Sequence, residues 1–261
     1  MDALDIAVTV FIGLVFGSFA TALSYRLPRD VSIVTRTRSQ CPACGHDLGV
    51  MDLVPVFSWI FLRNKCRYCR KVIGWQYPLI ELATLALCLL LYSVYGLKPE
   101  TAAVFALAPV LVSLIDIDLR YKIIPDSLNL AVLLTGVAAL GISTVIAASP
   151  LAFFLEKGAP AAGGTALYGL GSLLLRQGAM RVMKREAMGL GDVKFFAAAG
   201  FWLGLSADAA ALFMIVSGMS GIVLALIWKK RTGDAEVPFG PSLIIAFIAV
   251  LWLYPPAFMP V

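Results

Sequence analysis

Residues 209–228 read AAALFMIVSGMSGIVLALIW, twenty consecutive positions without a charged side chain. A helix that crosses the hydrocarbon core of a bilayer needs about 20 such residues. Comparable uncharged runs cover residues 6–25, 127–155 and 237–261. Because lipid offers no hydrogen bonds to an exposed backbone, these runs predict transmembrane helices. A transmembrane barrel would instead alternate polar and apolar residues over about ten positions. The sequence therefore predicts an all-α, polytopic membrane protein.

The composition of the whole chain agrees with a protein of the bilayer. Of its 261 residues, 60% are hydrophobic and 14% are charged, whereas soluble domains carry about 25% charged residues. A soluble enzyme, a disulfide-stapled secreted module and a disordered tail are therefore excluded. The apolar stretches predict about eight transmembrane helices, at residues 5–25, 79–96, 101–118, 126–147, 160–176, 190–205, 209–228 and 239–256.

The basic residues predict how these helices are oriented. Nineteen of the 21 Lys and Arg residues fall in four groups, within residues 26–71, 120–122, 176–194 and 229–231. Cytoplasmic loops are enriched in Lys and Arg, so we expect these groups inside and Lys98 and Lys157 outside. The first helix, residues 1–25, is expected to be retained, because its leading region is acidic and lacks a cleavage site. The net charge of +5 then reflects topology and predicts no nucleic-acid partner.

Residues 26–77 form the only sizeable block outside the predicted helices, and this block contains two cysteine pairs. Cys41-Pro-Ala-Cys44 and Cys66-Arg-Tyr-Cys69 place four thiolates on two tight turns, as tetrahedral zinc requires. Redox-active pairs or disulfides are the alternative, which a cytoplasmic location disfavours. A site closed by four sulfurs has no position for substrate. We therefore predict a cytoplasmic zinc-binding region whose metal is structural.

Two acidic residues are expected at membrane depth. Only 15 uncharged residues precede Asp116 in its helix, about 22 Å of a core about 30 Å thick. Another helix has 13 uncharged residues after Lys194 and spans the core only if it includes Asp192. Ionisable residues at such depth are costly and usually mark function. Spacing alone does not separate Asp116 from Asp118, since residues two apart point about 200° apart on a helix.

A pair of carboxylates allows hydrolysis, because one can stay protonated while the other takes a proton from water. The chain contains a single histidine, in the cysteine block, so a serine or cysteine nucleophile in the membrane has no histidine base. A zinc-stabilised transporter that relays protons through Asp116 and Asp192 is the alternative. Gly189-Leu-Gly191-Asp192 places two glycines before the acid, where a missing side chain lets backbone or substrate approach.

These motifs occur together with others along nearly the whole chain: Gly17-Ser-Phe19, Tyr25-Arg-Leu-Pro28, Tyr77-Pro-Leu with Glu81, Ile115-Asp116-Ile-Asp118, Pro125-Asp126, Gly189 to Lys194 and Pro238-Phe-Gly-Pro241. In this order they resemble the type IV prepilin peptidases, bifunctional leader peptidases and N-methyltransferases of the GxGD aspartyl protease group. The resemblance implies that residues 78–261 form a seven-helix catalytic region. It also implies prepilin or pseudopilin precursors as substrates and a multi-pass location in the bacterial inner membrane, with the active site facing the cytoplasm.

The resemblance also assigns roles to single residues. Asp116 and Asp192 match the family's catalytic aspartates. The supporting candidates are Gly189, Gly191, Lys194, Asp118, Asp126 and Glu81. Glu81 matches a position associated with methyl transfer, although an acid there is also an ordinary N-terminal helix charge. S-adenosylmethionine is implied as methyl donor by resemblance alone, and a peptidase without methylation remains an alternative. No motif indicates an oligomeric state.

Overall fold

The computed structural model of the chain describes residues 2–33, 38–184, 188–234 and 236–259. Within these residues it is helical, with two isolated β-bridges in the cysteine block and no strand. The α-helices are α1 (Ala3–Arg26), α2 (Phe57–Phe61), α3 (Gln76–Tyr95), α4 (Ala102–Phe105), α5 (Leu107–Tyr121), α6 (Asp126–Ile146), α7 (Pro150–Met183), α8 (Leu190–Leu203), α9 (Ala207–Thr232) and α10 (Gly240–Leu253). The prediction of an all-α fold is confirmed.

Among the described residues, five segments are long and apolar enough to cross a bilayer: Ala3–Arg29, Gln76–Tyr95, Pro99–Tyr121, Asp126–Ile146 and Ala207–Thr232. These correspond to five of the eight predicted helices, so the polytopic character is confirmed. The helices α8 and α10 have 14 residues each, about 21 Å, which is short of the hydrocarbon core. The count of eight therefore stays a prediction. Of the 19 basic residues expected inside, Arg36 and Arg185 lie outside the described residues.

Helix α7 is longer than the sequence predicted. We expected a helix over residues 160–176, but α7 runs from Pro150 to Met183, 34 residues or about 51 Å. Pro150 lies in the first turn, where a missing N–H costs nothing and the fixed φ suits a helix. Pro160 lies inside the helix without ending it. This length exceeds the thickness of the hydrocarbon core, and α7 is not among the candidate membrane spans of the described residues.

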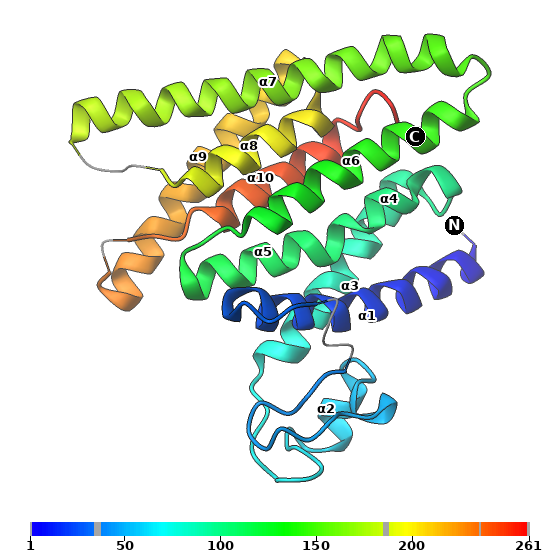
Figure 1. Cartoon of the computed structure of the whole chain (residues 1–261), viewed down its shortest axis with the longest axis vertical. Coiled ribbons are helices and arrows are strands. Elements are labelled where there is room, and N and C mark those ends of the chain that lie inside the picture. Colours follow the sequence, from blue (N-terminus) through cyan, green and yellow to red (C-terminus); the bar gives the residue numbers. More distant parts are fainter. Residues whose placement is uncertain (1, 34–37, 185–187, 235, 260–261) are drawn as a thin grey trace.

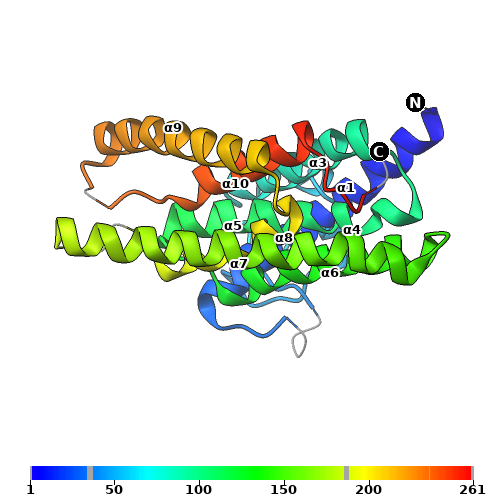
Figure 2. The same ribbon diagram turned by 90° about the horizontal axis from the view of Figure 1, so that it is seen from above.

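The helices pack around α5, which contacts α1, α3, α6 and α10. Figures 1 and 2 show α7 and α9 on opposite sides of the bundle, with α8 and α10 between them. Leu107, Leu111 and Leu114 on α5 and Leu243 and Phe247 on α10 are almost completely buried. By contrast, only 11% of the 18-residue apolar stretch of α9 is buried inside the protein. The corresponding share is 72% for the stretch in Pro99–Tyr121, which contains α5. Helix α9 therefore presents most of its surface to lipid, and α5 to the protein interior.

Close backbone contact joins α7 to α8. A Cβ atom on Gly164 would overlap the carbonyl oxygen of Gly200, and a Cβ on Gly200 would overlap the backbone of Gly164. Small residues let membrane helices approach at van der Waals distance, where packing replaces the hydrophobic effect as the driving force. This contact fixes α8, whose first turn carries Asp192.

The cysteine block connects α1 to α3 and lies beside the helix bundle, at the bottom of Figure 1. It contains the short helix α2 and a 3₁₀ turn at Val50–Asp52. Its other backbone is held by turns and the two isolated bridges. A segment this poor in regular structure needs another source of stability.

Candidate active site and metal centre

The four cysteines of the two pairs come together. The sulfur atoms of Cys41, Cys44, Cys66 and Cys69 all lie within 4.8 Å of one another, and the Cys41 and Cys69 sulfurs are 3.9 Å apart. Zinc–sulfur bonds of about 2.3 Å in a tetrahedron require sulfurs about 3.8 Å apart. The donor set therefore fits a zinc ion, and all four positions would be taken by protein. Such an ion would be structural.

The two cysteine turns repeat one backbone pattern. The N–H of Gly45 donates to the carbonyl oxygen of Cys41, and the N–H of Arg70 donates to that of Cys66. Gly45 has φ +71° and Arg70, at the equivalent position, has φ +60°. Burial opposes ionisation of the Cys41 thiol, yet backbone N–H groups of Ala43 and Cys44 lower its pKa to about 7. By contrast, although the backbone N–H of His46 lowers it, burial and hydrogen bonds with Cys41 and Cys69 raise the pKa of Cys44 to about 11.

An ion pair joins the two halves of the cysteine block. Arg67 donates to Asp52 at 2.7 Å, and Asp52 also accepts from the backbone N–H of Gly49. Burial opposes ionisation of Asp52, but the hydrogen bond and charge of Arg67 hold the pKa of this carboxyl below its usual range. Asp52 therefore links the 3₁₀ turn to the second cysteine pair.

Asp118, near the end of α5, is buried and faces α10. Its Oδ2 atom accepts a hydrogen bond of 2.8 Å from the backbone N–H of Gly240, the first residue of α10. A Cβ atom on Gly240 would lie 2.8 Å from the same oxygen, so no larger residue fits this approach. The N–H groups at a helix start have no partner within the helix, and they favour an anionic acceptor. The carboxyl of Asp118 is such an acceptor for the N–H of Gly240 at the start of α10.

Asp192 lies in the first turn of α8, in the position that a capping acid occupies. Its Oδ2 atom accepts a hydrogen bond of 3.0 Å from the backbone N–H of Gly189, the residue before the helix. This is one half of a capping box. Gly191, next to Asp192, packs against Ile124, which follows α5, so Asp192 lies near the end of α5 that carries Asp118. The structure thus brings an acid of α5 and an acid of α8 to the same end of the bundle.

Asp116 has a different environment, on the opposite face of α5. It forms an ion pair with Arg120, one turn further along the same helix. Its other oxygen is buried without a hydrogen-bond partner, as is the hydroxyl of Ser24 on α1. Of the two acids that the sequence could not separate, Asp116 is therefore paired with a cation, whereas Asp118 accepts a backbone N–H as Asp192 does.

The glycines before Asp192 serve close packing. A Cβ atom on Gly191 would lie 3.0 Å from the Cβ of Ile124 and 3.1 Å from its carbonyl oxygen. The side-chain amide of Asn129, on α6, donates to the carbonyl oxygen of Gly191 at 3.0 Å. These contacts hold the start of α8 against the start of α6, which fixes the position of Asp192.

Two other predicted residues pair with each other at the surface. Lys194 donates to Asp126 at 2.6 Å, and their side chains are 51% and 71% exposed. Exposed pairs of this kind contribute about 1 kcal/mol or less. The pair joins α8 to the start of α6 without contacting Asp118 or Asp192.

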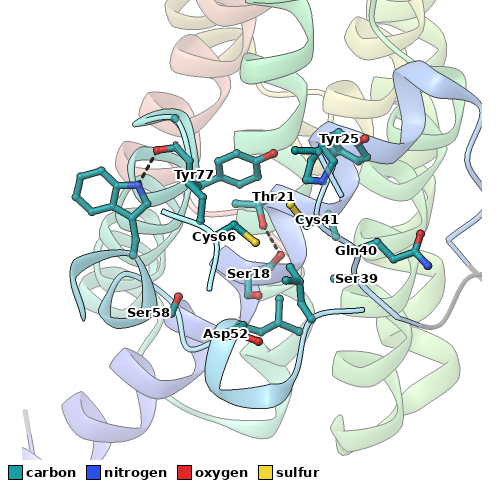
Figure 3. Close-up of a pocket in the computed structure, with 18 of the residues that line it drawn as sticks. Ser18, Thr21, Tyr25, Ser39, Gln40, Cys41, Asp52, Ser58, Cys66 and Tyr77 are labelled. Atoms are coloured by element: carbon teal, nitrogen blue, oxygen red, sulfur yellow. Dashed lines mark hydrogen bonds between the residues drawn. The ribbon is translucent and has the colours of Figure 1, made fainter. Parts of the chain in front are cut away.

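A cavity of ≈ 540 Å³ lies between the cysteine block and the helices α1 and α3. Figure 3 shows Tyr25 and Tyr77 along one side and Ser58 and Asp52 along the other. Glu81, on α3, also lines it. The volume is within the range of about 300–1,000 Å³ that is typical of sites for small ligands.

Glu81 also holds the cysteine block to α3. Its Oε2 atom accepts a hydrogen bond of 2.6 Å from the backbone N–H of Val56. Val56 has φ +62°, a conformation that is costly for a β-branched residue. The bond from Glu81 stabilises this strained turn, so Glu81 has a structural role besides lining the cavity.

Two families of known proteins match most of the chain. Residues 11–95 match the family described as Bacterial Peptidase A24 N-terminal domain, and residues 104–227 match the Type IV leader peptidase family. The chain belongs to the type IV leader peptidase family. The match covers both the region of the cysteine pairs and the helices that carry Asp118 and Asp192.

Several relatives of this type IV leader peptidase are named "Prepilin leader peptidase/N-methyltransferase". One from Burkholderia pseudomallei strain 1026b is 32% identical, over 98% of this chain and 88% of the relative. One from Aeromonas hydrophila is 34% identical, over 82% of this chain and 71% of the relative. A "Type 4 prepilin-like proteins leader peptide-processing enzyme" from Escherichia coli O78:H11 is 32% identical, covering 92% and 91%. No solved structure gives a significant match.

The family and the candidate membrane spans together indicate a multi-pass membrane peptidase. Sequence reasoning missed the positions that hold its acids. Gly240 belongs to the motif Pro238-Phe-Gly-Pro241, which carried the resemblance without an assigned role. Gly240 lies 122 positions from Asp118 in the sequence, so their contact could not be foreseen from local patterns. Asn129 has no motif signal, and only the tertiary contact with Gly191 identifies it.

Proposed function

We propose that this type IV leader peptidase is an aspartyl endopeptidase that removes the basic leader of prepilins or pseudopilins. Asp118 and Asp192 are the proposed catalytic pair. The observation that carries the proposal is geometric: Gly191 at the start of α8 packs against Ile124, just after α5, so Asp192 and Asp118 lie at the same end of the bundle. The resemblance assigned the first role to Asp116, but the ion pair of Asp116 with Arg120 favours Asp118 instead.

The hydrogen bonds of the pair support a division of labour. Each acid accepts a backbone N–H at its Oδ2 atom, from Gly240 for Asp118 and from Gly189 for Asp192. Two neighbouring carboxyls share one proton more readily than they hold two negative charges. The ionised carboxyl takes a proton from water as the water oxygen attacks the peptide carbonyl. The protonated carboxyl donates to the carbonyl oxygen, and the leaving amine receives a proton as the bond breaks.

The proposed orientation places this chemistry at the cytoplasmic face of the bacterial inner membrane. Arg120 and Lys122 follow Asp118 directly, and basic residues mark cytoplasmic ends. A precursor whose apolar helix lies in the bilayer would present its basic leader to the same face. The alternative of a proton-relaying transporter is not favoured, because the relatives are named as leader peptidases.

Substitution of single acids tests the pair. Asp118→Asn and Asp192→Asn should each abolish cleavage of a co-expressed prepilin, while the amount of enzyme in the membrane is unchanged. Asp116→Asn is the matched control, since it removes an acid two residues from Asp118, and it should retain cleavage. If Asp116→Asn abolished cleavage and Asp118→Asn did not, the pairing proposed here would be overturned in favour of the assignment by resemblance.

We further propose that the enzyme methylates the new amino terminus, as the second half of its relatives' name describes. The cavity beside the cysteine block fits a methyl donor such as S-adenosylmethionine in volume. The carboxylate of Glu81 and the rings of Tyr25 and Tyr77 would hold the positively charged donor. When bound, the donor supplies an activated methyl group, and the chain's residues orient the acceptor amine towards it.

Mass spectrometry of the mature pilin tests this second activity. Wild-type enzyme should yield a first residue heavier by one methyl group, while Tyr77→Ala should yield cleaved pilin without it. Cleavage with no methyl group from wild-type enzyme would leave a peptidase alone. We propose accordingly that residues 26–77 carry zinc and line the methyl-donor cavity together with Tyr25 and Glu81. Residues 78–261 carry the proposed peptidase pair, with residues 1–25 as the first membrane helix.

A further inference from the structure

The short helix α2 exposes an apolar face on the cysteine block. Phe57, Ile60 and Phe61 are 51%, 56% and 80% exposed. They lie three and four positions apart, so they share one face of the helix. A region outside a membrane rarely exposes aromatic side chains in a cluster without a binding partner. This apolar face of α2 therefore needs a binding partner that shields it from water.

This face adjoins the membrane surface of α3. The rings of Trp59, on α2, and Trp75, directly before α3, lie 4.3 Å apart. Trp75 is 73% exposed, and Leu79, one turn into α3, is 68% exposed. Because α3 is a candidate membrane span, Leu79 is a lipid-facing position. Exposed apolar side chains thus continue from the span onto the cysteine block.

The depth of α2 agrees with this continuity. Glu81 lies in the second turn of α3, and the N–H of Val56 donates to it. Since α3 is a candidate span, α2 starts about level with the end of that span, where the boundary of the bilayer lies. The hydrogen bond from Val56, immediately before α2, to Glu81 of α3 fixes the start of α2 relative to the bundle.

The charges next to α2 match a lipid surface. Arg63 and Lys65 follow the helix directly, and both are exposed. Basic side chains beside an apolar face bind the anionic headgroups of the cytoplasmic leaflet, while aromatic side chains occupy the boundary beneath. Tryptophan is enriched at this level in membrane proteins.

We propose that α2, with Trp75, inserts its apolar face into the headgroup and acyl boundary of the bilayer and anchors the cysteine block on the membrane. The occupant is lipid. Helices of this kind enter to a depth of about 5–10 Å. The anchor holds the cavity and the cysteine pairs next to the membrane, where a membrane-embedded substrate presents its leader. The proposal does not depend on which acids catalyse cleavage.

Photo-crosslinking tests the contact with lipid in the full-length enzyme. p-Benzoylphenylalanine replaces Phe61, and the enzyme is reconstituted in vesicles of phosphatidylethanolamine and phosphatidylglycerol without prepilin. Illumination should add the mass of one phospholipid to the peptide containing position 61. The matched control carries the probe at Ala43, an exposed residue of the first cysteine turn, and should gain no lipid. A protein adduct in place of lipid, or equal lipid labelling at both positions, would overturn the proposal.

A second measurement uses the fluorescence of Trp75 and needs no new residue on α2. The contribution of Trp75 is the difference between the emission of the wild-type enzyme and that of Trp75→Phe. Phospholipids brominated near the headgroup should quench this contribution. Phospholipids brominated near the end of the chain should quench it less, because the anchor lies at the boundary. No quenching by either lipid would contradict insertion, even where crosslinking yields are low. Adding prepilin should leave the quenching unchanged, and relief by prepilin would instead identify a substrate surface.

Discussion

The proposed peptidase site and the cysteine block are stabilised in different ways. Asp118 and Asp192 lie on helices that pack through buried apolar side chains, and backbone N–H groups at two helix starts hold their carboxyls. The cysteine block has few buried apolar residues and is organised around four sulfur atoms. The positions of the acids therefore depend on the geometry of the bundle, whereas the cysteine block is held around four sulfur atoms that fit a metal ion.

This difference predicts that the acids act as one unit. Asp118→Asn and Asp192→Asn should each lower prepilin cleavage by about 10³-fold or more. The double variant should lose no more than the stronger single variant, because removing either member already disables the pair. Rate measurements in detergent on purified enzymes would check this. Losses that multiply would show that the two acids act independently.

The second prediction concerns the backbone contact at Asp118. Gly240→Ala places a methyl group 2.8 Å from the Asp118 oxygen, so the carboxyl or the start of α10 must move. Displacement of about 1 Å costs about 10²-fold in rate. Gly218→Ala, on α9, is the control, since no atom lies within 4 Å of its Cβ position. Equal cleavage by both variants would mean that Gly240 does not position the acid.

The third prediction separates the metal from the peptidase. Cys66→Ser should remove zinc and make residues 38–75 sensitive to trypsin, because the cysteine block lacks an apolar core. Cleavage of prepilin should fall less than about tenfold, since the acids are held by helix packing. Cys88→Ala, which removes a buried cysteine of α3 outside the cluster, should keep its zinc. Metal analysis and limited proteolysis provide the readouts, and loss of zinc from both variants would contradict a site confined to the four cysteines.

The smallest effect is expected for the ion pair at the edge of the peptidase site. Lys194→Met breaks the contact with Asp126, which is exposed and contributes about 1 kcal/mol or less. Cleavage should therefore change by less than about fivefold. A larger loss, with unchanged zinc content, would indicate that Lys194 acts on Asp192 directly.

Sequence patterns predicted the membrane helices because hydrophobicity is local. The runs at 6–25 and 209–228 correspond to α1 and α9 within a few residues. The same reasoning began this helix too late, at residue 160, where proline suits a first turn, whereas α7 runs from Pro150 to Met183 and packs against α8. The spacing of the cysteines predicted their clustering, since each pair forms its own turn.

The sequence by itself determined the helical membrane fold, the cysteine cluster and the presence of acids at helix ends. Only the tertiary structure showed which acid of the α5 motif accepts the N–H of Gly240 at the start of α10. The reason is rotational: Asp116 and Asp118 point to opposite faces of one helix, and the positions of α1, α8 and α10 around that helix decide what each face meets. Asp116 meets the Ser24 side of the bundle, whereas Asp118 meets Gly240.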